Sequence, residues 1–296
     1  MVKHLGLKAY GKINLGLDVL RKREDGYHEV RMIMQTVGLY DRIDLICQEY
    51  PGIRVETNLY YLPNNENNLV YQAAKLLMDE FGVKRGISIK LKKFIPVAAG
   101  MAGGSSDAAA VLFGVNKMFG LGLSQEQLME RGVKIGADVP YCVMRGTALS
   151  EGIGELLTPL LPMPQCQVLV AKPGISVSTK YVYENLHANE LKPEQHPDID
   201  AMMAAISQGD IYKIAAHLGN VLETVTIPAY PVIAQIKEMM MDMGAIGSLM
   251  SGSGPTVFGL FTNPRAAASA YEKMRYQEGA KLVRQVYLTN FYNRKG

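Results

Sequence analysis

The chain has 296 residues, of which 48% are hydrophobic and 20% charged, and its formal net charge is +3 at pH 7. This composition excludes a disordered chain, and no stretch reaches the length of a membrane-spanning helix. The small net charge comes without a basic stripe, so nothing favours nucleic-acid binding. The three cysteines lack C-x-x-C spacing, which argues against a disulfide framework or a zinc site. The lysine-containing N-terminus is not a signal peptide, and we expect a cytoplasmic protein.

The first half of the chain is rich in predicted strands. Apolar and polar side chains alternate along residues 8–20, which predicts a half-buried strand. The apolar face consists of Ile13, Leu15, Leu17 and Val19, and the polar face of Lys12, Asn14 and Asp18. Further strands are predicted at 41–48, 52–58 and 86–94, and helices at 68–82 and 105–120. Ser124 and Gln127 form a capping-box pattern at the start of the next helix.

A cluster of three prolines, Pro159, Pro162 and Pro164, marks a change in pattern. We place a domain boundary there, which gives domains 1–160 and 161–296. Beyond it the sequence predicts a strand at 167–174, several helices, a strand–turn–strand at 247–261, a helix at 264–276 and a last strand at 281–291. Apart from the extra helices, this is the β-α-β-β-α-β order of ferredoxin-like domains. The predicted fold class is α+β in two domains.

The stretch PVAAGMAGGSSDAAA, which begins at Pro96, is the strongest functional signal. It joins a predicted strand to a predicted helix, but its glycine spacing fits neither the P-loop nor the dinucleotide fingerprint, and it has no lysine. Backbone N–H groups and the positive end of a helix dipole would make it an anion site. A tight turn with a serine as helix cap is the structural alternative. The five consecutive small residues from Ala102 to Ser106 favour the anion site.

Three other features could contribute to such a site. Lys12 is the candidate for the missing positive charge, although a strand lysine can also be merely solvent-exposed. Asp138 precedes Val-Pro and is either a turn residue or a general base for a substrate hydroxyl. Gly252 and Gly254 flank a serine between two predicted strands, either as a simple hairpin or as a second glycine loop that supports the first.

Together these motifs resemble the GHMP family of small-molecule kinases. That family has a lysine strand, a phosphate loop and a C-terminal glycine pair in this order, which correspond here to AYGKINLGLDV, PVAAGMAGGSSDAAA and MSGSGPTVFGLF. The stretches KINLGLDVLRKREDGYHEV, GADVPYC and GNVLE are similar to the branch that acts on a cytidine diphosphate-linked methylerythritol. The resemblance runs nearly end to end. It implies an N-terminal mixed α/β domain with ribosomal-protein-S5-like topology and a C-terminal ferredoxin-like domain.

The resemblance also implies an activity, which is transfer of the γ-phosphoryl group of ATP to the 2-hydroxyl of the methylerythritol moiety in the non-mevalonate isoprenoid route. Lys12 and Asp138 are the implied catalytic residues, with Asp138 accepting the hydroxyl proton and Lys12 orienting it. The implied ATP-binding loop consists of Pro96, Val97, Ala98, Ala99, Gly100, Met101, Ala102, Gly103, Gly104, Ser105 and Ser106. It departs from the family pattern at Met101, where Leu is common, and at Ala102, where Gly is common.

For the acceptor, the resemblance implies that Asn14 contacts the substrate near the catalytic lysine. Tyr27 and Tyr183 would sandwich the cytosine ring, and His28 would read its hydrogen-bonding edge. Mg²⁺ is expected with ATP, but the sequence assigns no protein ligand to it, and Asn68 is the one candidate for an adenine contact. We expect a monomer or homodimer with no nucleic-acid or membrane partner.

Two alternatives remain open at this point. Another kinase of the family, acting on homoserine or mevalonate, would share the loop but has no use for a pocket formed by Tyr27, His28 and Tyr183. A non-catalytic binding module on the same fold should have lost Lys12 or Asp138, and this chain has both.

Overall fold

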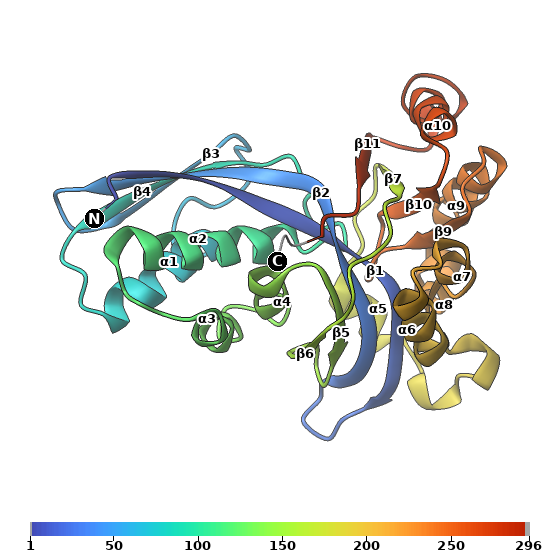
Figure 1. Ribbon diagram of the computed structural model, residues 1–296, viewed down its shortest axis with the longest axis horizontal. Coiled ribbons are helices and arrows are strands. Elements are labelled where there is room, and N and C mark those ends of the chain that lie inside the picture. The colour runs from blue at the N-terminus through green and yellow to red at the C-terminus, as the bar shows by residue number, and fades with distance from the viewer. Residues whose placement is uncertain (1, 294–296) are drawn as a thin grey trace. The chain divides into compact units, whose positions relative to one another are not determined.

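The computed structural model describes residues 2–293 (Figure 1) and divides into two compact units. The first unit comprises the chain up to Gly11 together with Leu39–Val97 and Ala102–Met144, and the second comprises Lys12–Gly38, Ala98–Met101 and the chain from Arg145 onward. Two long strands, β1 (His4–Lys22) and β2 (His28–Gln48), run through both units. The sequence predicts a single division after residue 160, because the proline cluster marks a change in pattern there. Such a cluster carries no information about strands that two units share.

The first unit consists of strands and four helices. The second half of β2 pairs antiparallel with β4 (Gly86–Lys92), and β3 (Ile53–Thr57) pairs parallel with β4. The helices are α1 (Leu69–Glu80), α2 (Gly103–Phe119), α3 (Gln125–Gly132) and α4 (Val139–Met144). The predicted capping box of Ser124 and Gln127 is confirmed at the start of α3. A Cβ at Gly114 of α2 would lie 2.3 Å from Leu45 Cδ1, so this glycine lets the helix lie close to β2.

The second unit begins with the second half of β1. Here β1 pairs parallel with β8 (Gly219–Asn220), β2 pairs antiparallel with β5 (Thr147–Glu151), and β5 pairs with β6 (Leu156–Pro159). The side chains predicted to form a polar face, Lys12, Asn14 and Asp18, are only 5%, 0% and 6% exposed. The solvent-exposed alternative for Lys12 is therefore wrong, because this part of β1 is buried on both faces.

The rest of the second unit contains a four-stranded antiparallel sheet (Figure 1) in the order β11-β7-β10-β9. Its strands are β7 (Gln167–Lys172), β9 (Gly247–Met250), β10 (Val257–Phe261) and β11 (Gln285–Asn290). The strand that comes first in the chain lies between the last and the third, which is the ferredoxin-like order. The predicted ferredoxin-like arrangement is confirmed, and the predicted helix at 264–276 is α10 (Pro264–Tyr276).

Five helices lie between β7 and β9, which is more than a minimal ferredoxin-like domain needs. They are α5 (Thr179–Glu184), α6 (Ile199–Gln208), α7 (Ile211–Ala216), α8 (Glu223–Ala229) and α9 (Val232–Asp242). Short 3₁₀ helices cover Ala188–Glu190, Pro193–Gln195 and Glu278–Lys281. Among the described residues, no helix combines the length and the apolar character needed to cross a membrane.

Candidate active site

The predicted phosphate loop connects β4 to α2. The residue before α2, Ala102, has a left-handed backbone (φ 52°, ψ 31°) and gives the helix no side-chain cap. Ala98 is also left-handed, with φ 50°. This conformation costs an alanine roughly 1–2 kcal/mol. Because α2 begins at Gly103, the alternative of a serine helix cap is wrong, and Ser106 Oγ instead donates to Tyr10 O at 2.5 Å. The first-turn N–H groups are those that a bound anion would use.

Lys12 lies directly beside this loop. Its backbone N–H donates to Met101 O at 3.1 Å, and its ammonium donates to Asn14 Oδ1 at 2.7 Å. The Asn14 amide in turn lies 3.5 Å from Met32 Sδ. The sequence predicts that a distant strand supplies the positive charge that the loop lacks, and the structure brings that strand to the loop.

The turn between β9 and β10, residues 251–256, is the second glycine loop. It is a hairpin turn, as the simpler interpretation expects, and it also contacts the first loop. Ser251 Oγ donates to Gly100 O at 2.9 Å, and a Cβ at Gly100 would lie 2.0 Å from Ser251 O. Gly252 has φ 58°, and a Cβ there would lie 3.2 Å from Gly100 Cα. At Gly254, with φ 84°, a Cβ would lie 2.6 Å from Met250 Sδ. Both predicted glycines thus occupy positions that a larger residue would strain.

Asn220, which sequence analysis did not single out as a site residue, binds the backbone of the second glycine loop and of the strand before it. Its side-chain amide donates to Met250 O and to Gly252 O, each at 2.8 Å, and its Oδ1 accepts from Leu222 N at 3.0 Å. Next to it, Glu223 Oε1 accepts from Met250 N at 2.8 Å. The only sequence signal for these residues is the likeness of GNVLE to the family.

The predicted base-binding residues are only partly brought together. Tyr27 is 60% exposed in the turn between β1 and β2. His28, the first residue of β2, packs against Tyr183 of α5, with ring centroids 5.1 Å apart and an interplanar angle of 46°. Desolvation and the nearby charge of Lys22 lower the pKa of His28. A neutral imidazole can donate one hydrogen bond and accept another.

Asp138 is half-buried in the turn before α4, in the first unit. Its backbone carbonyl accepts from Cys142 N at 3.1 Å, so it also starts the helix. Its pairing with Lys12 stays a prediction. The candidate adenine contact, Asn68, uses its side chain as the N-cap of α1, accepting from Val70 N at 3.1 Å and donating to Pro63 O at 2.7 Å.

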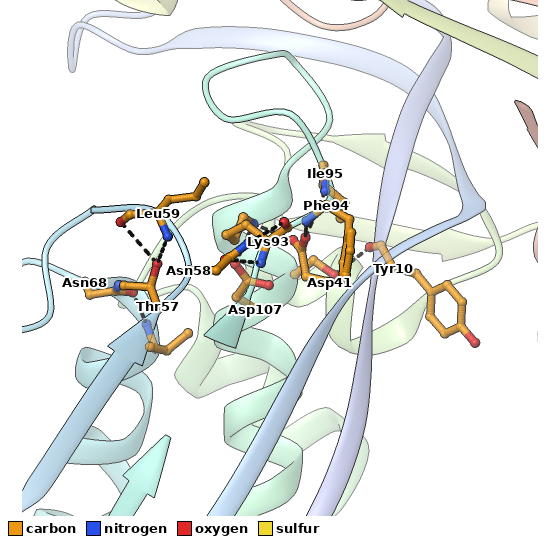
Figure 2. A network of polar contacts seen from close by, with 12 residues as sticks. Tyr10, Asp41, Thr57, Asn58, Leu59, Asn68, Lys93, Phe94, Ile95 and Asp107 are labelled. Carbon is orange, nitrogen blue, oxygen red and sulfur yellow. Dashed lines mark hydrogen bonds and ion pairs between the residues drawn. The ribbon is translucent and has the colours of Figure 1, made fainter. Parts of the chain in front are cut away.

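Sequence analysis missed a buried charged cluster at the base of the first loop (Figure 2), which we call the lysine clamp and define as Asp41, Lys93 and Asp107. The Lys93 ammonium binds Asp41 Oδ2 on β2 and Asp107 Oδ2 on α2, the latter at 2.7 Å. Asp41 Oδ1 accepts from Phe94 N at 2.5 Å and from Ile95 N at 2.8 Å. The lysine clamp therefore fastens the segment that enters the loop to the helix that leaves it.

The clamp holds two carboxyl groups for one ammonium, and all three side chains are at least nine-tenths buried. Desolvation raises the pKa of Asp107 well above its usual value, and the charge of Asp41 adds to this, although Lys93 opposes it. Desolvation lowers the pKa of Lys93, but the attraction of Asp107 and Asp41 outweighs it, and the net pKa is raised. Asp107 Oδ1 is buried and has no hydrogen-bond partner among the described residues.

Two family models match the chain, the GHMP kinases N terminal domain over residues 68–146 and the GHMP kinases C terminal over residues 202–280. A 4-diphosphocytidyl-2-C-methyl-D-erythritol kinase from Lachnoclostridium phytofermentans is 55% identical over 291 residues, which cover 98% of each chain. A crystal structure of 4-(cytidine 5'-diphospho)-2C-methyl-D-erythritol kinase has a TM-score of 0.81 at 31% identity and covers 98% of this chain and 100% of its own. A homoserine kinase from Cytophaga hutchinsonii has a TM-score of 0.76 at 20% identity and covers 98% of this chain and 95% of its own. This similarity is one of fold alone.

Proposed function

Because the chain belongs to the GHMP kinase family, we propose that it phosphorylates 4-diphosphocytidyl-2-C-methyl-D-erythritol, the substrate in its relatives' names, with ATP in the non-mevalonate isoprenoid route. The observation that carries this proposal is the hydrogen bond from Lys12 N to Met101 O. It sets a buried ammonium beside a glycine loop that has no lysine of its own. A phosphate-binding loop needs such a charge when phosphoryl groups are transferred.

The first loop would bind the phosphates of ATP through the backbone N–H groups at the start of α2. These groups lack a side-chain cap, and the residues in front of them are small, so phosphate oxygens can approach the backbone. The Lys12 ammonium, oriented by Asn14, would offset the charge that develops on the transferring group.

Asp138 would act as the general base. The oxygen of the substrate's 2-hydroxyl attacks the γ-phosphorus of ATP, the bond from that phosphorus to the bridging oxygen of ADP breaks, and the hydroxyl proton passes to the Asp138 carboxylate. A positioned base of this kind is worth about 10²–10⁴-fold in rate. We therefore expect Asp138→Asn to lose turnover by that order while it retains ATP binding, and Lys12→Met to be similarly impaired.

Mg²⁺ bound with ATP would offset the charge of the phosphate oxygens during transfer. The uncapped N–H groups at the start of α2 fit anionic phosphates rather than a bare cation. The described part of the chain contains no group of three or more His, Cys, Asp or Glu residues suited to hold a metal ion. We further propose a cytoplasmic monomer or homodimer without nucleic-acid or membrane partners.

The cytidine end of the substrate would lie at His28 and Tyr183. Their packed rings offer an aromatic face and a hydrogen-bonding edge, and stacking of a base on an aromatic ring is worth about 1–3 kcal/mol. The exposed Tyr27 would close on the base from the adjoining turn. Homoserine and mevalonate contain no nucleobase, so kinases that act on them would gain nothing from an aromatic nucleobase site.

Turnover of ATP with a panel of alcohols tests the proposal. We expect ADP and a phosphorylated product, identified by mass, with the cytidine substrate and not with homoserine or mevalonate. The uridine analogue should be much poorer, because a base with the wrong donors and acceptors leaves buried polar groups unpaired. Equal rates with both bases, or good activity on methylerythritol phosphate without a nucleotide, would contradict the base site.

A further inference from the structure

The second glycine loop has hydrogen bonds in two directions. Ser251 Oγ donates to Gly100 O in the first loop, at 2.9 Å. Two residues later, Ser253 Oγ lies 2.8 Å from Thr179 Oγ1, so one hydroxyl donates to the other. Thr179 is the first residue of α5, the helix that carries Tyr183. Two serines of one turn therefore bind the nucleotide loop and the helix that presents an aromatic ring.

The two partners in the second of these bonds differ in rigidity. Ser253 is 6% exposed and lies between two glycines in a turn whose carbonyls are bound by the Asn220 amide. Thr179 is exposed, and α5 has only six residues. A helix of that length is not stable by itself, so its orientation depends on its contacts with the rest of the protein.

A buried side chain and a cap are among the contacts that orient α5. Val182 is its only buried residue, and Ser178 caps it by accepting from Tyr181 N at 3.3 Å. The hydrogen bond of Thr179 adds a fixed point at the first residue of the helix. The Ser253–Thr179 bond joins α5 to the well-held turn, and the Tyr183 ring then meets His28 at 5.1 Å.

We propose that Ser253 is a positioning residue for recognition of the cytidine substrate, acting through Thr179 and α5 on Tyr183. This rests on the proposed function, because it assumes that Tyr183 contacts the base. Within the same turn, Ser251 supports the loop that would bind ATP, and Ser253 supports the helix that would contact the cytidine substrate. Removal of each hydroxyl should therefore affect the KM of a different substrate.

Steady-state kinetics of Ser253→Ala, Thr179→Ala and their double variant, with Ser251→Ala as the matched control, test this division. Loss of one neutral hydrogen bond corresponds to a change of about three- to tenfold. We expect Ser253→Ala to raise the KM for the cytidine substrate by that factor, with the KM for ATP within about twofold of wild type. Ser251→Ala should show the opposite pattern.

Two further comparisons separate positioning from general weakening of the fold. Thr179→Ala should match Ser253→Ala, and the double variant should be no worse than either, because the two hydroxyls form one bond. Thr179→Ser keeps the hydroxyl and should behave as wild type. Because Thr179 is exposed, its variants should fold. They can therefore test the inference even if Ser253→Ala does not fold.

Several results would overturn the inference, namely equal increases in both KM values, no increase in either, or additive effects in the double variant. Tyr183→Ala distinguishes this failure from failure of the proposed function. If Tyr183→Ala raises the KM for the cytidine substrate and Ser253→Ala does not, only the positioning role is wrong. If Tyr183→Ala has no effect, the base site itself is wrong.

Discussion

The two glycine loops are held in chemically different ways. The first is fastened by the lysine clamp, in which Lys93 joins Asp41 to Asp107 in the protein interior. The second is fastened by neutral groups, namely the Asn220 amide and serine hydroxyls. Removal of one partner from a buried ion pair leaves an uncompensated charge, whereas removal of a neutral partner leaves only an unpaired dipole. Mutation of the lysine clamp should therefore mainly lower the stability of the fold. Mutation of the groups that hold the second loop should cost less stability and mainly change substrate binding.

Lys93→Met is the strongest test of this contrast. It leaves two buried carboxyl groups without a cation, and we expect the free energy of unfolding to fall by about 3–5 kcal/mol. Urea unfolding measures the change. The neighbouring Lys92 is exposed, so Lys92→Met is a matched control that should stay within about 0.5 kcal/mol of wild type. Similar values for both variants would show that the clamp contributes little.

Asn220→Ala addresses the neutral network. It leaves Met250 O, Gly252 O and Leu222 N without their partner, which should lower the free energy of unfolding by about 1–3 kcal/mol, less than Lys93→Met. We also expect a higher KM for ATP, because the second loop supports the first. Asn64 is exposed, and Asn64→Ala should change neither quantity. A larger loss of stability for Asn220→Ala than for Lys93→Met would reverse the comparison.

Asp107→Asn tests the charged nature of the clamp through the pH dependence of the free energy of unfolding. The pKa of Asp107 is raised above its usual 3.8 in the folded protein, so the folded state binds this proton more tightly than the unfolded state does. The free energy of unfolding then falls as pH rises from about 4 through the raised pKa. Asn keeps the shape and does not titrate, so the variant should gain stability relative to wild type as pH rises. A constant difference between pH 4 and pH 8 would mean that Asp107 does not titrate in this range.

Ala102→Gly should have the smallest effect and the opposite sign. Glycine adopts the left-handed backbone of Ala102 without strain, and we expect stabilisation by up to about 1 kcal/mol in thermal unfolding. Ala204 is exposed in the right-handed helix α6, so the same substitution there should destabilise by up to about 1 kcal/mol. Destabilisation at both positions would argue against a strained Ala102.

The features that sequence analysis predicted correctly depend on local pattern. The helix α10, the capping box of Ser124 and the strand–turn–strand around Gly252 are all encoded by residues close together in the chain. Lys12 was a candidate for the missing charge from the sequence, but hydrophobic periodicity left a solvent-exposed lysine equally open, and the family likeness decided between the two. Its burial depends on strands that pair with β1 and β2 from far along the sequence.

The lysine clamp could not be predicted for a similar reason. Lys93 directly follows β4 and is in phase with the apolar residues of that strand, but the local pattern names no acidic partner for it, and Asp41 lies 52 positions earlier. Only the register of β2 against β4 brings the two together. The contact of His28 with Tyr183 likewise joins residues far apart in the chain, and no local pattern encodes it.

The sharing of β1 and β2 between the two units has a consequence for synthesis on the ribosome. The last segment of the first unit ends at Met144, so that unit can close when about half of the chain has emerged. The second half of β1 and the first half of β2 belong to the other unit, whose four-stranded sheet ends with β11. These early-made apolar strands must wait until β11 has been synthesised before their own unit is complete. During that interval they are the segments most in need of a chaperone.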